Sequence, residues 1–327
     1  MKNFSISVAM CTYNGSKYLN QQLESIASQS LLPNELIVCD DNSTDNTIEI
    51  IKNFSKKAPF EVRLYQNSLN LGSTKNFEKA IGLCDGEIIV LSDQDDIWEK
   101  NKLQRIVEEF SKSSTIGGVF SNASLIDENG NLLKGDLWSS VRFKKKEQRK
   151  AMKGEIFKTL LKHNVVTGAT MAFRSEYKNI LLPIPKDFIH DEWIALLLGG
   201  FSKIVPISDK LICYRIHPNQ QLGVPQSKSL KEELRKTKEI GSEEYLKTKK
   251  KHEEAKKVII NYGFIANKDR LIIKYLDNEI NFLEYRASIH KTNNKLKRVP
   301  LVLKNVVNAH YFLYSSGFKS IMKDLFL

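Results

Sequence analysis

The first part of the chain alternates between short apolar runs and longer segments that are apolar on one side only. The apolar runs are Ile6–Cys11, Glu35–Cys39, Val62–Tyr65 and Glu87–Leu91. Short runs of this kind, bounded by polar residues, predict strands. Nearly continuous apolar strands are typical of a parallel sheet that is covered on both faces.

Helices are predicted between these strands. They are the segment that carries Leu19, Leu23 and Ile26 on one side, the segment Thr47–Phe54, and the segment Thr74–Leu83. Strands that alternate with helices in this way form a doubly wound α/β fold. Ligands of such folds bind beyond the carboxyl ends of the strands.

Further elements are expected downstream. The predicted strands are Gly118–Ala123, Val165–Arg174 and Leu211–His217. A helix is expected over Ile97–Phe110, with Asp96 available as its N-cap, and another over Glu192–Leu198. Residues 142–153 are basic and are expected to form a mobile surface segment, a candidate contact for an anionic acceptor.

The composition changes after Gly223. Residues 228–257 are rich in Lys and Glu, which is typical of a solvated helix. We therefore place a main domain at 1–223 and a basic helical subdomain at 224–327. In residues 295–327, apolar residues recur at helical spacing between lysines. This segment either docks on the main domain or on a second subunit of a homodimer, or lies on anionic lipid as an interfacial helix.

Bulk composition narrows the class of protein. The 327 residues are 41% hydrophobic and 27% charged, as in ordinary globular proteins, and the net charge of +12 favours an anionic partner. The four cysteines form no C-x-x-C pair, which favours reduced thiols and a reducing compartment. We find no signal peptide and no run near the length of a membrane span. The expected location is the cytoplasm, either free or peripheral to the inner face of the cell membrane.

An acidic cluster ends the fourth predicted strand. Asp93, Asp95 and Asp96 follow the apolar run directly. Three carboxylates this close raise one another's pKa, and a divalent cation relieves their repulsion. Hard oxygen ligands suit Mg²⁺ or Mn²⁺, which keep positions open for water and substrate phosphates. The alternative is an acidic loop that caps the following helix.

Polar residues at the other strand ends are expected to meet this cluster in one crevice. They are Thr12, Tyr13 and Asn14 after the first strand, and Asp40 and Asp41 after the second. The glycine-rich fingerprint of dinucleotide binders is absent after the first strand, and so is a P-loop lysine. The ligand is therefore held mostly by side-chain oxygens, and a phosphorylated ligand would need a metal.

Three motifs taken together carry a family resemblance. They are Thr12-Tyr13-Asn14, the segment Val38–Asp45, and Asp93-Gln94-Asp95-Asp96. In this order they resemble the family 2 glycosyltransferases of the GT-A fold, a Rossmann-like mixed α/β sheet. The resemblance covers residues 4–223 and makes 1–223 the catalytic domain. The D-Q-D-D-I-W form is most similar to the bacterial rhamnosyltransferase branch, which implies a role in the synthesis of surface polysaccharide.

The resemblance implies an inverting transfer of one sugar from a nucleoside diphosphate donor, dTDP- or UDP-linked. Asp41 would bind the nucleotide base and Asp93 the ribose, while Asp95 would bind the Mn²⁺ or Mg²⁺ ion. The nucleoside pocket would be lined by Thr12, Tyr13 and Asn14. The acceptor would be a glycan or a lipid-linked glycan.

Residues 168–217 supply the other half of the expected site. Asp191, at a helix start, suits a general base that removes the acceptor's proton, and the resemblance assigns it that role. Gly168 would let a substrate approach the backbone, and Trp193 either stacks on a sugar or belongs to the core. His217 would complete the metal shell or contact the leaving phosphate, and Arg215 would offset the phosphate charge.

Two other functions remain open on the sequence alone. A nucleotidyltransferase also uses metal-bound carboxylates, although it usually needs a glycine-rich phosphate loop, and the first strand end offers only Gly15. A non-catalytic module that binds carbohydrate or nucleic acid would also suit the basic charge. The acidic crevice would repel nucleic acid phosphates, so we expect no nucleic acid partner.

Overall fold

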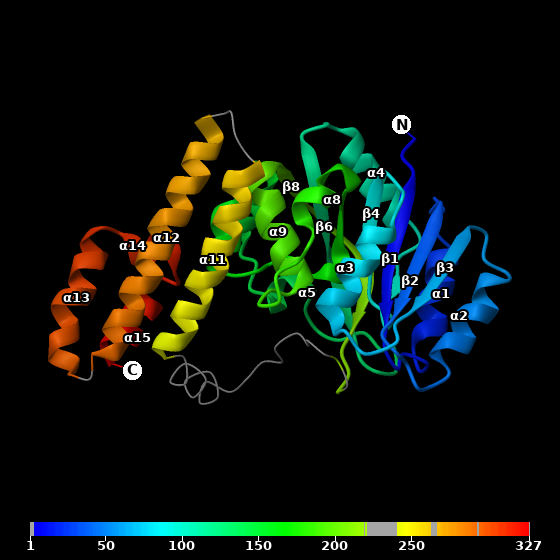
Figure 1. Ribbon diagram of the computed structural model, residues 1–327, viewed down its shortest axis with the longest axis horizontal. Coiled ribbons are helices and arrows are strands. Elements are labelled where there is room, and N and C mark those ends of the chain that lie inside the picture. The colour runs from blue at the N-terminus through cyan, green and yellow to red at the C-terminus, as the bar shows by residue number, and fades with distance from the viewer. Residues whose placement is uncertain (1–2, 219, 221–240, 263–266, 293, 327) are drawn as a thin grey trace. The chain divides into compact units, whose positions relative to one another are not determined.

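The computed structural model describes residues 3–218, 220, 241–262, 267–292 and 294–326 (Figure 1). The chain forms two compact units. One unit comprises Met1–Ile156 and Asn164–Val224, and the other comprises Phe157–His163 and Pro225–Leu327. The division lies one residue from the boundary placed at 223, and it adds the short helix α7 (Phe157–Lys162) to the helical unit.

The first unit is built on one sheet of eight strands in the order β3-β2-β1-β4-β7-β6-β8-β5. The strands are β1 (Ile6–Thr12), β2 (Glu35–Asp40), β3 (Glu61–Gln66), β4 (Ile88–Ser92), β5 (Ile97–Trp98), β6 (Ile116–Ile126), β7 (Met171–Arg174) and β8 (Lys203–Arg215). β1 pairs in parallel with β2 and β4, and β7 runs antiparallel to β4 and β6. The prediction of a mixed α/β sheet is confirmed.

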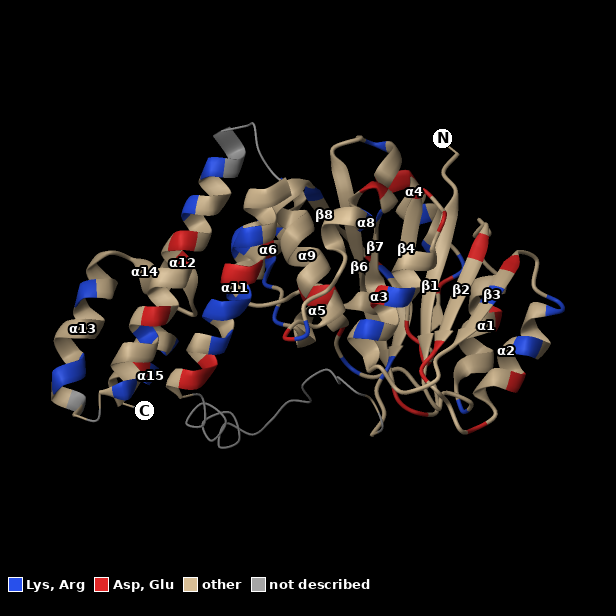
Figure 2. Ribbon diagram, in the orientation of Figure 1, with Lys and Arg blue, Asp and Glu red and all other residues tan. Residues whose placement is uncertain are grey.

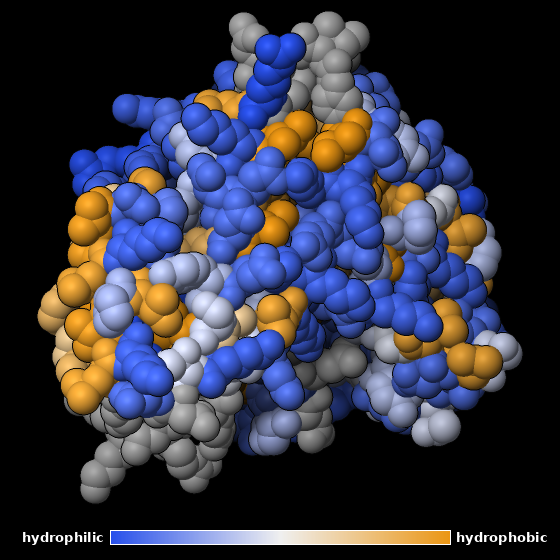
Figure 3. Space-filling model, turned by 60° about the vertical axis from the view of Figure 1, so that its left-hand side comes forward, coloured by the Kyte–Doolittle hydropathy of each residue, from blue (hydrophilic) through white to orange (hydrophobic). Residues whose placement is uncertain are grey.

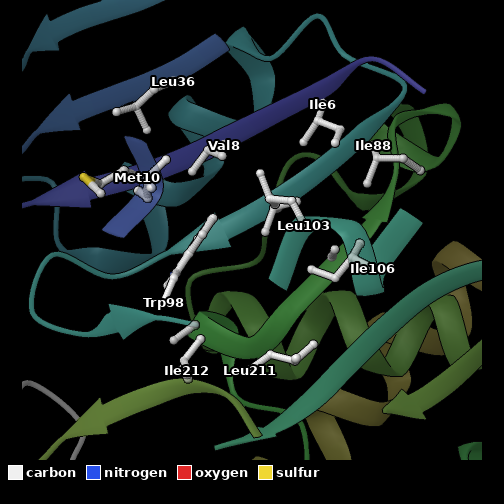
Figure 4. Close-up of a cluster of buried hydrophobic side chains, with 14 of the residues drawn as sticks. Ile6, Val8, Met10, Leu36, Ile88, Trp98, Leu103, Ile106, Leu211 and Ile212 are labelled. Atoms are coloured by element: carbon white, nitrogen blue, oxygen red, sulfur yellow. The ribbon is translucent and has the colours of Figure 1, made fainter. Parts of the chain in front are cut away.

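Helices cover both faces of this sheet. They are α1 (Leu19–Ala27), α2 (Thr47–Ser55), α3 (Ser73–Leu83), α4 (Lys102–Ser111), α5 (Leu137–Ser140), α6 (Lys145–Met152), α8 (Lys178–Leu181) and α9 (His190–Phe201). Val8 and Met10 of β1 pack in one hydrophobic cluster with Leu103 and Ile106 of α4 (Figure 4). Because side chains alternate along a strand, Ala9 is buried on the opposite face, where α3 packs against β1.

The segment after the acidic cluster does not form the predicted helix at once. Ile97 and Trp98 form β5, which pairs antiparallel with β8, and α4 begins only at Lys102. The carboxylate of Asp96 accepts the backbone N–H of Arg215 at 3.0 Å, so it bridges to β8 and does not cap a helix. Pairing with a distant strand outweighs the local helical pattern here.

Two other segments differ from expectation. The predicted strand over Val165–Arg174 is a strand only at Met171–Arg174, and a 3₁₀ turn, η1 (Gly168–Thr170), precedes it. Residues 142–153 contain helix α6, whose first turn is held by the Glu147 carboxylate accepting the Lys144 backbone N–H at 3.0 Å. The segment is therefore an ordered helix in the structure.

The second unit is helical. Besides α7 it contains α11 (Ser242–Tyr262), α12 (Asn267–Lys291), α13 (Lys295–Val307), α14 (His310–Tyr314) and α15 (Phe318–Phe326). Phe282 and Ile289 of α12 pack against Val302 and Tyr311 in its core. The part of the predicted solvated helix at 228–240 lies outside the described residues. Among the residues described, no helix has both the length and the apolar content to cross a bilayer.

Candidate active site

The strand ends of the first unit surround one cavity of about 520 Å³. Its lining includes Thr12, Tyr13, Asp41, Asp93, Gln94, Asp95, Thr167, Gly168, His190 and Asp191. Figure 2 shows the acidic loops gathered at the lower end of the sheet, beyond the tips of β1 and β2. The structure thus brings together seven of the residues that the sequence nominated, from five separate segments of the chain.

The acidic loop is held in place by its glutamine. The Oε1 of Gln94 accepts the Tyr13 backbone N–H at 2.9 Å, and its Nε2 donates to the Tyr13 carbonyl at 3.0 Å. This pair of bonds ties the loop to the end of β1. Burial and the nearby carboxylates of Asp95 and Asp191 together raise the pKa of Asp93 to about 7. The loop therefore concentrates negative charge where a cation would be stabilised.

Asp95 and His217 form a pair that suits a divalent ion. The Oδ2 of Asp95 lies 2.9 Å from the Nε2 of His217, although His217 follows β8 and is far away in the sequence. One Asp96 carboxylate oxygen is buried beside them without a hydrogen bond. Among the residues described, no three His, Cys, Asp or Glu side chains are grouped to hold a metal ion alone. An ion bound here would draw its remaining ligands from water and from a bound phosphate.

Asp41 shapes the opposite end of the cavity. Its carboxylate accepts the backbone N–H groups of Leu71 and Gly72, at 2.7 and 2.9 Å, and the Nδ2 of Asn67 at 2.9 Å. Gly72 has φ +80°, a backbone conformation that favours glycine. Asp41 is only 3% exposed, yet it lines the cavity. It therefore fixes this turn at the edge of the cavity.

Asp191 begins α9 and faces the same cavity. Its two oxygens accept the Gly168 backbone N–H at 2.9 Å and the Asn164 Nδ2 at 3.1 Å. Burial raises the pKa of Asp191 to about 6, in spite of these two hydrogen bonds, which favour the charged form. A carboxylate with such a pKa is ionised at neutral pH and still basic enough to take a proton.

Close packing around position 168 requires a glycine there. A Cβ atom at this position would lie 2.6 Å from the Nε2 of His190, which no real Cβ tolerates. The His190 ring stacks on Phe77 with centroids 4.0 Å apart, so it has little room to retreat. Burial lowers the pKa of His190 to about 3, which leaves the ring neutral. The glycine therefore lets η1 approach α9 and deliver its N–H to Asp191.

Four nominated residues lie outside the cavity lining, namely Trp193, Asn14, Arg215 and His217. His217 still contacts Asp95, while the contacts of the other three differ from those expected. Trp193 is 1% exposed, and its Nε1 donates to the Leu181 carbonyl at 2.8 Å, so it is a core residue. Asn14 has φ +47° and its Oδ1 accepts the Thr44 backbone N–H at 2.9 Å, so it organises the loop.

Arg215 is the third. Its Nε donates to the Asp95 carbonyl at 2.7 Å, its Nη2 donates to the Gln21 Oε1 at 2.7 Å, and its guanidinium lies over the Tyr18 ring. The side chain is 1% exposed. Arg215 therefore binds the backbone of the acidic loop, whereas the sequence predicts that it contacts a phosphate.

Two residues that the sequence did not single out support the site. Lys102 is fully buried, and its Nζ donates to the Ala169 carbonyl at 2.8 Å, in the turn that also holds Asp191. Burial lowers the pKa of Lys102 to about 7, while Asp96 and Asp93 oppose that shift. Asn164, the second, follows α7 and orients Asp191. Neither belongs to a recognisable motif, so sequence reasoning had no signal for them.

Comparison with known proteins identifies a protein family that matches this chain. Residues 7–179 match the family model for glycosyl transferase family 2. An uncharacterised glycosyltransferase of Nostoc sp. is 29% identical over 216 residues, and the alignment covers 65% of each protein. The chain thus spans about two thirds of the length of that relative.

Two relatives of stated activity also match. A UDP-Glc:alpha-D-GlcNAc-diphosphoundecaprenol beta-1,3-glucosyltransferase of Escherichia coli is 25% identical over 67% of this chain and 79% of its own length. A dTDP-rhamnosyl transferase of Shigella flexneri is 34% identical over 37% of this chain and 40% of its own length.

Solved structures share the fold. TarS of S. aureus, in complex with UDP-GlcNAc, has a TM-score of 0.56 at 18% identity, covering 94% of this chain and 81% of that one. A mannosyltransferase from Pyrobaculum calidifontis, in complex with GDP-Man and Mn²⁺, has a TM-score of 0.55 at 16% identity, covering 99% of this chain and 86% of that one. At these identities the likeness concerns the fold, which is the GT-A fold expected from the motifs.

Proposed function

This chain belongs to glycosyl transferase family 2, and from that premise we propose that it transfers one sugar from a nucleoside diphosphate donor to a glycan acceptor, with inversion at the anomeric carbon. The observation that carries the proposal is that one cavity is lined by Asp93 and Asp95 from the end of β4 and by Asp191 from α9. An inverting transfer needs charge stabilisation at the leaving diphosphate and one proton acceptor.

Asp95 and His217 would hold the divalent ion. The Asp95 carboxylate suits Mn²⁺ or Mg²⁺, an imidazole ligand favours the transition metal Mn²⁺ of the two, and the related mannosyltransferase structure contains Mn²⁺. When bound, such an ion stabilises the negative charge that develops on the departing diphosphate. Gln94 and Arg215 hold the loop that presents Asp95, so the ligand position is prepared before the donor arrives.

Asp191 would act as the base. As the acceptor oxygen forms its bond to the anomeric carbon and the carbon–oxygen bond to the diphosphate breaks, the hydroxyl proton passes to a carboxylate oxygen of Asp191. The Gly168 N–H and the Asn164 amide fix the orientation of that carboxylate. Partial burial keeps it basic, and this matching of the pKa to neutral pH is what a general base needs.

Gly168→Ala is expected to lower the transfer rate about 100-fold, because a displaced turn moves Asp191 away from its working position. The added methyl group collides with His190, so either that ring or η1 must shift. Steady-state kinetics measures the effect. The matched control is Gly82→Ala, whose Cβ would lie 3.8 Å from its nearest neighbour and should leave the rate unchanged. A Gly168→Ala protein with wild-type kinetics would contradict this role of the turn.

The donor is proposed to be a dTDP- or UDP-linked sugar, rhamnose included. Asp41 offers a carboxylate edge at the nucleoside end of the cavity, and uracil and thymine present the same edge to it. Relatives with stated activities use a dTDP-linked and a UDP-linked sugar. The acceptor of one of them is a lipid-linked sugar, and we propose a glycan or lipid-linked glycan of a bacterial surface polysaccharide here.

A donor screen tests the function. With Mn²⁺ present, dTDP-rhamnose or a UDP-sugar at about 100 times its dissociation constant should stabilise the protein by about 2.7 kcal/mol and raise its melting temperature by about 4–6 °C. With an acceptor, nucleoside diphosphate should be released. Release of pyrophosphate would indicate a nucleotidyltransferase instead. Absence of any nucleotide-dependent shift would favour a non-catalytic binding module.

A further inference from the structure

Helix α13 has two apolar faces, and only one of them is covered. On the inner face Val302 is 1% exposed and packs in the core of the helical unit. On the outer face Leu296, Val299, Leu303 and Val307 are 81%, 40%, 55% and 83% exposed. A helix that only served the core of this unit would carry polar residues on its outer side.

The outer residues form a continuous stripe. They are spaced by three, four and four positions, so at 100° per residue they lie within an arc of about 80° along about 16 Å of helix. Single exposed apolar residues are normal on protein surfaces, but a contiguous group marks a surface that contacts something else. No other described part of the chain covers this stripe, since these side chains are exposed with the whole described chain taken into account.

The next two helices also carry exposed apolar residues. Exposed apolar residues of α14, of α15 and of their ends are Phe312, Leu313, Phe318, Met322 and Phe326, all at least 41% exposed. Figure 3, which brings forward the side of Figure 1 that carries α13, shows hydrophobic side chains at the surface between hydrophilic ones. Together with the α13 stripe, these residues form what we call the C-terminal apolar face.

The charge around this face has one sign. Residues 295–326 contain six Lys and Arg and a single acid, Asp324. Asp324 is fully buried and binds the Arg286 guanidinium at 2.6 and 2.7 Å, so it contributes no negative charge at the surface. Lys297 and Lys304 are exposed, seven residues apart, and lie beside the α13 stripe. Figure 2 shows α13 with basic residues and no acidic ones.

The charge around the C-terminal apolar face distinguishes between two candidate binding partners, a second copy of the chain and an anionic membrane. A second copy of the chain, placed face to face, would bring the same lysines together and repel. An anionic membrane surface would attract them, while the apolar stripe enters the boundary between headgroups and acyl chains. Each Lys near an anionic bilayer strengthens binding by about fivefold. Apolar residues flanked by lysines are the pattern of a helix that lies in such an interface.

We propose that the C-terminal apolar face docks on an anionic phospholipid membrane. This proposal rests on the proposed function and extends it, because docking would bring the enzyme to the membrane surface that carries a lipid-linked acceptor. Docking itself depends only on the described residues of α13 to α15. It can therefore fail while sugar transfer stands, or succeed if the transfer proves to be a different reaction.

The test is flotation of the full chain with vesicles. Wild type should float with vesicles of phosphatidylglycerol and phosphatidylcholine, and should bind at least about 25-fold more weakly to phosphatidylcholine alone or at high salt. The triple variant Leu296→Ser, Leu303→Ser, Val307→Ser should lose at least about 10-fold in membrane affinity, since three buried apolar side chains are removed. Lys297→Gln with Lys304→Gln should lose about 25-fold on anionic vesicles only.

Controls separate docking from folding and from catalysis. Ile260→Ser alters an apolar residue of α11 that is similarly exposed, at 48%, and should float as wild type does. Binding of UDP with Mn²⁺, followed by calorimetry, should be the same for wild type and the triple variant. Equal flotation of wild type and the triple variant would overturn the proposal. So would a wild-type dimer that the triple variant dissolves in the absence of any vesicle binding, since the face would then be a subunit interface.

Discussion

Asp191→Asn is expected to lower kcat by about 10² to 10⁴-fold, the usual effect of losing a general base, while the affinity for the donor stays the same. Asparagine keeps the size and can keep the hydrogen bond from Gly168, so the fold of the turn should survive. The amide cannot accept the acceptor's proton. Donor affinity by calorimetry and kcat by nucleoside diphosphate release measure the two quantities separately.

The pH profile gives an independent readout of the same residue. Because burial raises the pKa of Asp191 to about 6, the base is protonated and inactive below that pH, and it is ionised above it. The kcat/KM of the wild type should therefore rise through an acid limb near pH 6 and level off above it. Asp191→Asn should lack this limb. Glu192→Gln, which removes the neighbouring charge, should keep both the limb and a near-wild-type rate, and a loss as large as that of Asp191→Asn would count against our assignment of the base.

Asp95→Ala should weaken the binding of UDP in the presence of Mn²⁺ by about 10- to 100-fold or more, the range seen when support of a metal ligand is lost. His217→Ala should have a similar effect, because its Nε2 lies 2.9 Å from the Asp95 carboxylate and would share the ion. With a chelator present, wild type and both variants should bind UDP equally weakly.

The matched control for the metal prediction is Asp209→Ala. It removes a surface carboxylate that pairs with Arg105 at 2.9 Å, far from the cavity lining. It should bind UDP and Mn²⁺ as wild type does. Should Asp95→Ala retain full Mn²⁺-dependent affinity while its melting temperature matches wild type, the ion must be held by other groups.

The strands and the crevice were predictable because their causes are local. Each parallel strand from Ile6 to Leu91 is a buried apolar run, and the carboxyl ends of parallel strands must meet at one edge of the sheet. Thr12, Asp41 and Asp93 therefore came together as expected. The position of Asp191 at a helix start facing the cavity was predictable, but its hydrogen bonds with Gly168 and Asn164 required the fold.

The predictions that differ from the structure have a different cause. Ile97 and Trp98 fit a helical pattern, but the exposed edge of β8 recruits them as a strand. Arg215 ends a strand beside the acidic loop, which suggested a phosphate ligand, while the structure uses it to bind backbone carbonyls. Trp193 lies only two residues after Asp191, yet the helix turns it into the core. Contacts between segments distant in the sequence decided all of these, and no single-segment pattern encodes them.

The proposed transfer mechanism requires one divalent ion to lie opposite one base in the same cavity. A crystal structure with UDP and Mn²⁺ measures this directly. We predict Mn²⁺ at about 2–2.5 Å from a carboxylate oxygen of Asp95 and from the diphosphate, with His217 in its shell and Asp191 facing the cavity beyond the terminal phosphate. An ion bound away from Asp95, or Asp191 turned out of the cavity that holds the nucleotide, would contradict it.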